Sequence, residues 1–278
     1  MTLSVPTLGC PEWTLAQIVD RIHGYGYHGI DLRGLGDTLD VTLRPEFSTQ
    51  IDRTRALLES HGLVVSGFSS SALCYADSVE KADASRAEVE RYCVAAKALG
   101  TTYIRVFGGR FPSEMPVADA VAKAAPLATE LADIAAGYGC VIVVETHDNW
   151  IDSSAARMLL ETVDHPSCKA LWDMNHPWRM NGESAERTMA QIGDWVAYTH
   201  IKDSAPTADG EFAYVPLGCG DVPVGDAVRL LARRGYDGWL VFEHEKRWIP
   251  SLPDPDVAFP QYAIAMRIIL QEEGIRVG

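Results

Sequence analysis

Short apolar runs alternate with amphipathic segments along almost the whole chain. The apolar runs lack polar alternation, which indicates strands that are covered on both faces. The amphipathic segments carry apolar residues at helical spacing, with a candidate N-cap at Thr14 and candidate stops at Gly62 and Gly100. Repeated strand-then-helix units predict a parallel sheet with helical crossover connections.

We count eight such units. Strands are expected at about 3–8, 29–34, 63–71, 102–109, 141–147, 168–174, 196–203 and 238–245. Helices are expected at about 14–24, 46–61, 79–99, 117–138, 153–163, 185–192, 222–234 and 257–273, and residues 204–221 form the longest expected loop. Eight units in a chain of 278 residues predict an α/β protein with a closed (β/α)8 TIM barrel, in which residues 1–278 form one domain. An open doubly wound sheet is the alternative. It normally carries a glycine fingerprint after its first strand, and LGCPEW is not one.

Charge and composition narrow the class of partner. The formal net charge is −14, which argues against binding to nucleic acid and to an anionic membrane surface. The six cysteines are scattered without a C-x-x-C pair, which favours a reduced intracellular compartment. No signal peptide or membrane span is visible, so a cytoplasmic protein is expected.

The last four expected barrel strands each finish on a residue type that binds metals. Near their carboxyl ends they carry Glu145, Asp173, His200 and Glu243. Carboxyl ends of barrel strands meet on one face of the barrel, where function collects. One imidazole with three carboxylates suits one divalent ion, with Mn²⁺ expected first, Mg²⁺ or Co²⁺ next, and Zn²⁺ as a further alternative.

These segments resemble the xylose-isomerase-like barrels, which include ketose 3-epimerases, inosose dehydratase, dehydroshikimate dehydratase and an endonuclease branch. The resemblance covers essentially the whole chain and is carried by VVETH, WDMNH, THIKD and GYDGWLVFEHE. It implies that Glu145, Asp173, His200 and Glu243 hold one metal. It also implies that Glu145 and Glu243 move protons at a carbon beside a substrate carbonyl.

His147 departs from the epimerase pattern, which usually has Asn there, and Ile151 stands where the epimerases have a further Glu. The Glu-Thr-His triplet looks more like the lyase branches. If the strand continues past Glu145, His147 points to the same side. It is then a candidate general acid or base, because imidazole titrates near neutral pH. The structural alternative is that His147 orients Glu145 or caps the next helix.

Further residues are candidates for substrate binding, and each has a structural alternative. Lys202 is expected to share a face with His200 and so to reach the substrate. The structural alternative is an ion pair with Asp203 or with another acid of the site. Arginines near the ends of the second and fourth strands bind a carboxylate or hydroxyl, or form internal salt bridges. Aromatic residues near strand ends form an apolar wall for a sugar, or belong to the core. The residues predicted to bind substrate are His176, Lys202, Arg33, Arg105, Phe107 and Trp150.

Several functions stay open. The first is a metal-dependent isomerase or epimerase that enolises a small polyhydroxylated carbonyl compound. The second is a lyase or dehydratase on a keto-cyclitol, keto-sugar or dehydroshikimate-like substrate. A metal-binding subunit that acts only with a partner is less favoured, and the endonuclease branch least. The family resemblance also implies a homo-oligomer.

Overall fold

The parallel strands of the predicted barrel are present and form a closed ring. The computed structural model describes residues 1–276. The ring has the order β1-β10-β7-β6-β5-β4-β3-β2. The predicted (β/α)8 fold class is therefore confirmed. Its strands are β1 (Thr2–Pro6), β2 (Gly29–Leu32), β3 (Val64–Leu73), β4 (Tyr103–Phe107), β5 (Val141–Glu145), β6 (Cys168–Asp173), β7 (Val196–Ile201) and β10 (Trp239–Phe242).

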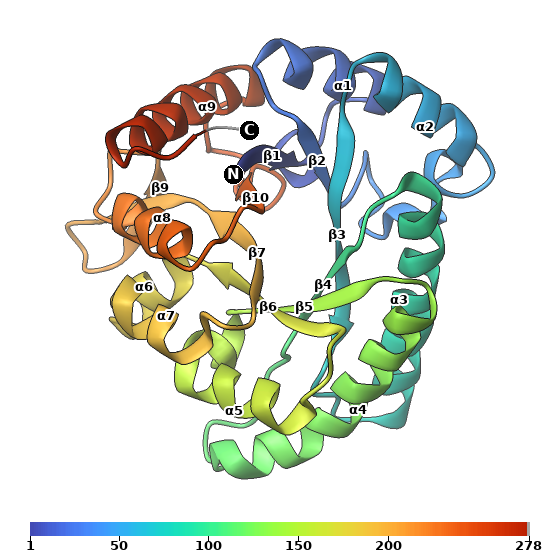
Figure 1. Ribbon diagram of the computed structural model, residues 1–278, viewed down its shortest axis with the longest axis vertical. Coiled ribbons are helices and arrows are strands. Elements are labelled where there is room, and N and C mark those ends of the chain that lie inside the picture. Colours follow the sequence, from blue (N-terminus) through green and yellow to red (C-terminus); the bar gives the residue numbers. More distant parts are fainter. Residues whose placement is uncertain (277–278) are drawn as a thin grey trace. The chain divides into compact units, whose positions relative to one another are not determined.

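Helices follow the strands along the chain (Figure 1). Thr14 caps the first of them as predicted, in a capping box with Gln17. The α-helices are α1 (Leu15–Gly24), α2 (Ile51–Ser60), α3 (Val79–Leu99), α4 (Val117–Gly137), α5 (Ser153–Val163), α6 (Asn175–Asn181), α7 (Ala185–Ile192), α8 (Val224–Arg233) and α9 (Pro255–Glu272). Short 3₁₀ helices lie at Thr7–Gly9, Val41–Leu43, Pro45–Phe47 and Asp148–Ile151. Within the described residues 1–276, no helix combines the length and apolar character that a membrane span requires.

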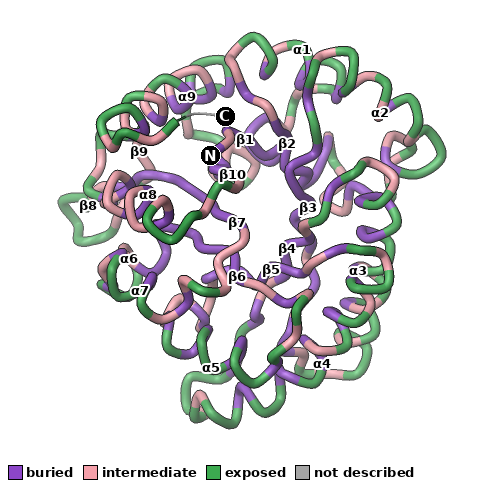
Figure 2. The backbone as a smooth tube through the Cα atoms, viewed as in Figure 1, coloured by how far each residue is buried: buried purple, intermediate pink, exposed green. Residues whose placement is uncertain are grey.

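The chain divides into two compact units. Met1–Ser66 and Thr199–Gly278 form one, which we call the terminal unit, and Gly67–Tyr198 form the other, the central unit. The assignment of residues 1–278 to one domain stays a prediction. In both units the barrel strands are largely buried and the outer faces of the helices are exposed (Figure 2). Side chains of β5 such as Ile142 and Val143 have no exposed surface, as the unbroken apolar run predicted.

Three local predictions were wrong. Helix α2 begins at Ile51 and not near residue 46, because Pro45–Phe47 forms a separate 3₁₀ turn. The expected loop 204–221 contains most of an antiparallel hairpin, in which β8 (Asp203–Pro206) pairs with β9 (Phe212–Val215). Strand β5 ends at Glu145, and His147 is the N-cap of a 3₁₀ helix. The alternation of side chains along a strand therefore does not predict the direction of the His147 ring.

Asp203 holds the loop that follows this hairpin through hydrogen bonds to its backbone. Its buried carboxylate accepts backbone N–H groups of Gly218 and Gly220 at 2.9 Å and of Val222 at 3.3 Å. A Cβ on Gly220 would lie 2.1 Å from Asp203 Oδ1, so the close approach requires glycine. The carboxylate therefore supplies the partners for backbone groups that the loop itself leaves unpaired.

We expect Asp203→Ala to lower the free energy of unfolding by about 2–4 kcal/mol, because several charge-assisted hydrogen bonds to backbone are lost at a buried position. Urea unfolding measures the change. Asp209→Asn, an exposed position between β8 and β9, is the matched control and should change stability by less than about 0.5 kcal/mol. Equal stability of Asp203→Ala and the control would contradict the role of Asp203.

Candidate active site

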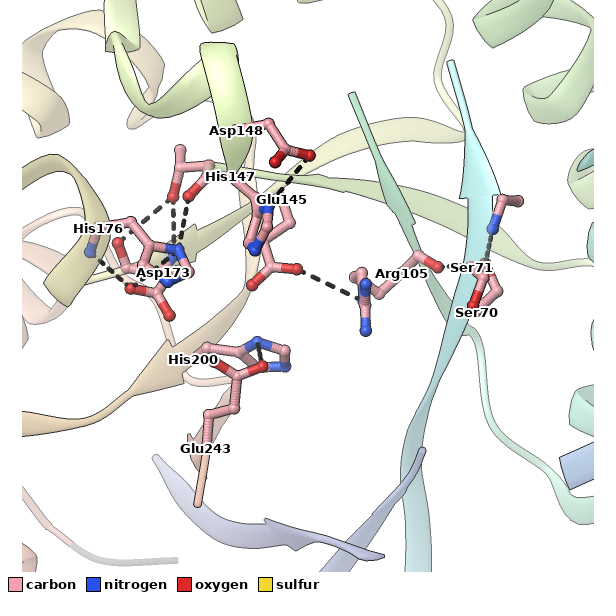
Figure 3. A network of polar contacts seen from close by, with 12 residues as sticks. Ser70, Ser71, Arg105, Glu145, His147, Asp148, Asp173, His176, His200 and Glu243 are labelled. Atoms are coloured by element: carbon pink, nitrogen blue, oxygen red, sulfur yellow. Dashed lines mark hydrogen bonds and ion pairs between the residues drawn. The ribbon is translucent and has the colours of Figure 1, made fainter. Parts of the chain in front are cut away.

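Glu145 is the last residue of β5 and is 2% exposed. A buried carboxylate needs a positive partner, and Arg105 of β4 supplies one, with its Nε 3.5 Å from Glu145 Oε2 (Figure 3). The Arg105 guanidinium carbon also lies 3.8 Å from the centre of the Phe107 ring. This position of Arg105 matches the internal ion pair that the sequence left open.

Asp173 is the last residue of β6 and is fully buried. Its Oδ1 accepts the backbone N–H groups of Asn175 and His176, both at 2.8 Å, at the start of α6. Its own N–H donates to Thr146 Oγ1 at 2.9 Å. These bonds hold the carboxylate in one orientation at the strand end.

His200 of β7 and Glu243, the residue after β10, lie in the terminal unit. His200 Nδ1 lies 3.1 Å from Glu243 Oε1 (Figure 3). The buried Lys202 forms an ion pair with Glu243, and its Nζ lies 2.9 Å from Glu245 Oε1. Lys202 therefore pairs with site acids, whereas Asp203 binds the loop described above.

The four residues predicted as metal ligands are brought together. One ligand atom from each of them lies within 4.8 Å of the others. All four side chains are almost completely buried, and three of them are carboxylates, so a divalent cation matches the donor atoms. The residues that could hold a metal ion are Glu145, Asp173, His200 and Glu243.

Asp148 is a site residue that sequence reasoning missed. Its Oδ2 lies 3.1 Å from His147 Nδ1, and its Oδ1 accepts a hydrogen bond from Arg110 Nε at 2.6 Å. Its backbone has φ of 51°, in the left-handed region that non-glycine residues seldom adopt. Burial alone would raise the pKa of Asp148, but His147 and Arg110 together lower it below its usual value. An Asp directly after the candidate His was the available sequence signal.

The other predicted residues are placed as follows. His147 is partly exposed, and its ring centre lies 4.8 Å from that of Phe107 and 4.9 Å from that of His176. The His176 Nδ1–H donates to the Thr146 carbonyl at 3.1 Å. Arg33 is buried in the terminal unit, where its backbone N–H donates to Thr7 Oγ1. Trp150 has no exposed surface and donates its indole N–H to the Gly109 carbonyl at 2.7 Å. A fully buried ring of this kind belongs to the core, which argues against the predicted contact with substrate.

The chain belongs to the Xylose isomerase-like TIM barrel family, whose pattern matches residues 19–263. Among solved structures, the probable 3-DHS dehydratase AsbF of petrobactin synthesis from Bacillus anthracis is 19% identical, with a TM-score of 0.80 over 96% of this chain and 99% of that one. The IOLI protein with a binding zinc atom is 18% identical, with a TM-score of 0.83 over 98% and 99% of the two chains.

A third similar structure is that of D-psicose 3-epimerase with D-tagatose from Clostridium cellulolyticum H10. It is 14% identical, with a TM-score of 0.76 over 98% of this chain and 99% of that one. A comparison with curated proteins finds no match. Solved relatives with this fold thus include both epimerases and dehydratases.

Proposed function

We propose that this protein is a metal-dependent isomerase or epimerase, which moves a proton at a carbon beside the carbonyl of a small polyhydroxylated substrate. The observation that carries the proposal is the buried set of three carboxylates and one imidazole, with ligand atoms within 4.8 Å of one another. Two of the carboxylates are glutamates, the residue type that the resemblance assigns to proton transfer.

The donor set fits one divalent ion held by Glu145, Asp173, His200 and Glu243. Carboxylate-rich sites favour Mn²⁺, Mg²⁺ or Co²⁺, and we expect Mn²⁺ first, although the IOLI structure was solved with zinc. When bound, such an ion would polarise a substrate carbonyl and make the neighbouring C–H more acidic.

Two side chains of the protein then carry out the proton transfer. Glu145, steadied by Arg105, and Glu243, steadied by Lys202, are the two groups that remove and return the proton. Removal by one glutamate and return by the other to the opposite face of the carbon inverts that centre. Return to a neighbouring carbon shifts the carbonyl and gives isomerisation.

A lyase is the second candidate, and the contact between His147 and Asp148 favours it. An Asp that holds a His ring in place is a common way to build a general acid or base. Such a group could protonate a β-hydroxyl as it leaves, which converts enolisation into dehydration. The similarity to AsbF supports this alternative.

The two functions are separated by products. Keto-sugars and keto-cyclitols are incubated with the protein and Mn²⁺ in D₂O and followed by NMR. An isomerase or epimerase forms an isomer with deuterium at the affected carbon, whereas a lyase forms a dehydrated product. Dehydration without any isomer would overturn the first proposal and establish the second.

Size-exclusion with mass analysis of the active chain tests the proposed homo-oligomer and the need for a partner.

If the lyase reaction is the one catalysed, we expect His147→Asn to lower kcat for dehydration by about 100-fold and to leave the bound metal unchanged, because His147 would protonate the leaving hydroxyl and is not a proposed ligand. Asp148→Asn should lower kcat by about tenfold through loss of the His147 contact. Turnover and metal content by mass spectrometry are measured together. Wild-type kcat in His147→Asn would reduce this residue to a structural role.

A further inference from the structure

A large cleft in the terminal unit lies apart from the proposed metal ligands. Its volume is about 820 Å³, within the range of small-molecule sites. Residues from three loops line it, which follow β1, β2 and β10. These three strands are neighbours, since β1 pairs with both β2 and β10 (Figure 1). The loops all leave the carboxyl ends of the strands, which is the functional face of a barrel.

Aromatic surface is available in this cleft. Trp248 is 50% exposed, which is unusual for so large an apolar side chain. The Arg247 guanidinium carbon lies 5.8 Å from the centre of its ring. Arg247 also donates its Nη1 to the Gly36 carbonyl at 2.6 Å and its backbone N–H to the Leu8 carbonyl at 3.2 Å. The segment that presents Trp248 is therefore tied to the loops after β1 and β2.

The charges of the lining argue against an anionic ligand. Four acids line the cleft with two cations, and both cations are engaged: Arg247 with Gly36, and Lys246 with Asp254 and the Pro250 carbonyl, each at 2.9 Å. Glu12 and Asp37 are exposed carboxylates on two of the loops, and Asp37 Oδ1 lies 3.6 Å from Arg44 Nη1. Carboxylates accept hydrogen bonds from hydroxyl groups and repel phosphate.

We propose that this cleft binds a second, neutral sugar ring that is joined to the reacting one, so that the substrate is a glycoside. An exposed indole face attracts the weakly positive C–H bonds of a sugar ring, while the carboxylates at the rim accept its hydroxyls. Lys246, which lines the cleft, follows Glu243 by three residues in the loop after β10, so the cleft and one of the proposed proton-transfer groups are built on the same loop. The inference rests on the proposed function for the reacting ring, and it identifies the substrate class.

Binding of methyl β-cellobioside tests the proposal, with methyl β-D-glucoside as the single-ring comparison. Neither probe has a carbonyl group, so binding to the Mn²⁺-loaded protein is measured by calorimetry without turnover. The two-ring probe should bind at least tenfold more tightly than the single ring. Trp248→Ala should remove that advantage, Trp248→Phe should keep most of it, and Met180→Ala, at another exposed apolar position, should not change it.

Equal affinity of the two probes, or an unchanged advantage in Trp248→Ala, would overturn the proposal. Failure of the proposed function is a separate result. If the two-ring probe binds through Trp248 while no keto-sugar is converted, the cleft is a glycoside site but the isomerase assignment is wrong. If keto-sugars are converted and Trp248→Ala leaves two-ring binding intact, the reaction stands and the cleft does not serve it.

Discussion

Replacing Glu145 or Glu243 with Gln is expected to lower kcat by about 1,000-fold at saturating Mn²⁺. Glutamine keeps the size and an oxygen donor of the side chain but cannot take up a proton, so the substitution isolates proton transfer from shape. Initial rates of product formation, together with deuterium exchange into the substrate from D₂O, measure the loss. Exchange should disappear in the variant that no longer removes the proton.

The matched control is Glu161→Gln, a surface glutamate of α5 that pairs with Arg157. It should retain wild-type kcat and metal content. Because Glu145 and Glu243 are also proposed ligands, metal content is measured in each variant. A Glu145→Gln protein that is fully loaded with metal and fully active would remove Glu145 from the proton-transfer role, and the same holds for Glu243.

Removal of the metal is expected to abolish activity. After treatment with EDTA and gel filtration, turnover should fall to the background rate, and Mn²⁺ or Co²⁺ should restore it. The melting temperature should also fall, because an ion that binds only the folded state stabilises it by mass action. Thermal unfolding with each ion therefore ranks Mn²⁺, Mg²⁺, Co²⁺ and Zn²⁺ independently of activity.

Asp173→Asn is the companion variant for this experiment. Asp173 is a proposed ligand but has no proposed role in proton transfer, and an amide can still accept the N–H groups of Asn175 and His176. Its melting temperature should thus respond weakly to added metal while the fold persists. Undiminished activity after complete removal of metal would refute the proposed centre, whatever the arrangement of the four side chains.

The barrel strands were predictable because their signal is local. A run such as Val141–Val144 is apolar at every position, and its short length and β-branched residues indicate a strand covered on both faces. The cap at Thr14 follows from its spacing to Gln17 in the same way. The β8–β9 hairpin was missed because its strands have only four residues each and the first of them, Asp203–Pro206, begins with two polar residues and ends in Pro.

The residue types at the site were also legible in the sequence, because Glu145, Asp173, His200 and Glu243 directly follow or end strands. The direction of His147 was not, because β5 ends at Glu145 and the turn after it aims the ring toward Asp148 and Phe107. The pairing of Arg105 with Glu145 and the exposure of Trp248 likewise depend on neighbours far along the chain.

By itself, then, the sequence determined the (β/α)8 fold and the candidate metal ligands, since both follow from periodicity and from residue types at strand ends. Only the tertiary structure decided which charges pair, which aromatic ring is exposed and which loops enclose a cleft. These properties depend on contacts between residues distant in sequence, for which no local pattern carries a signal.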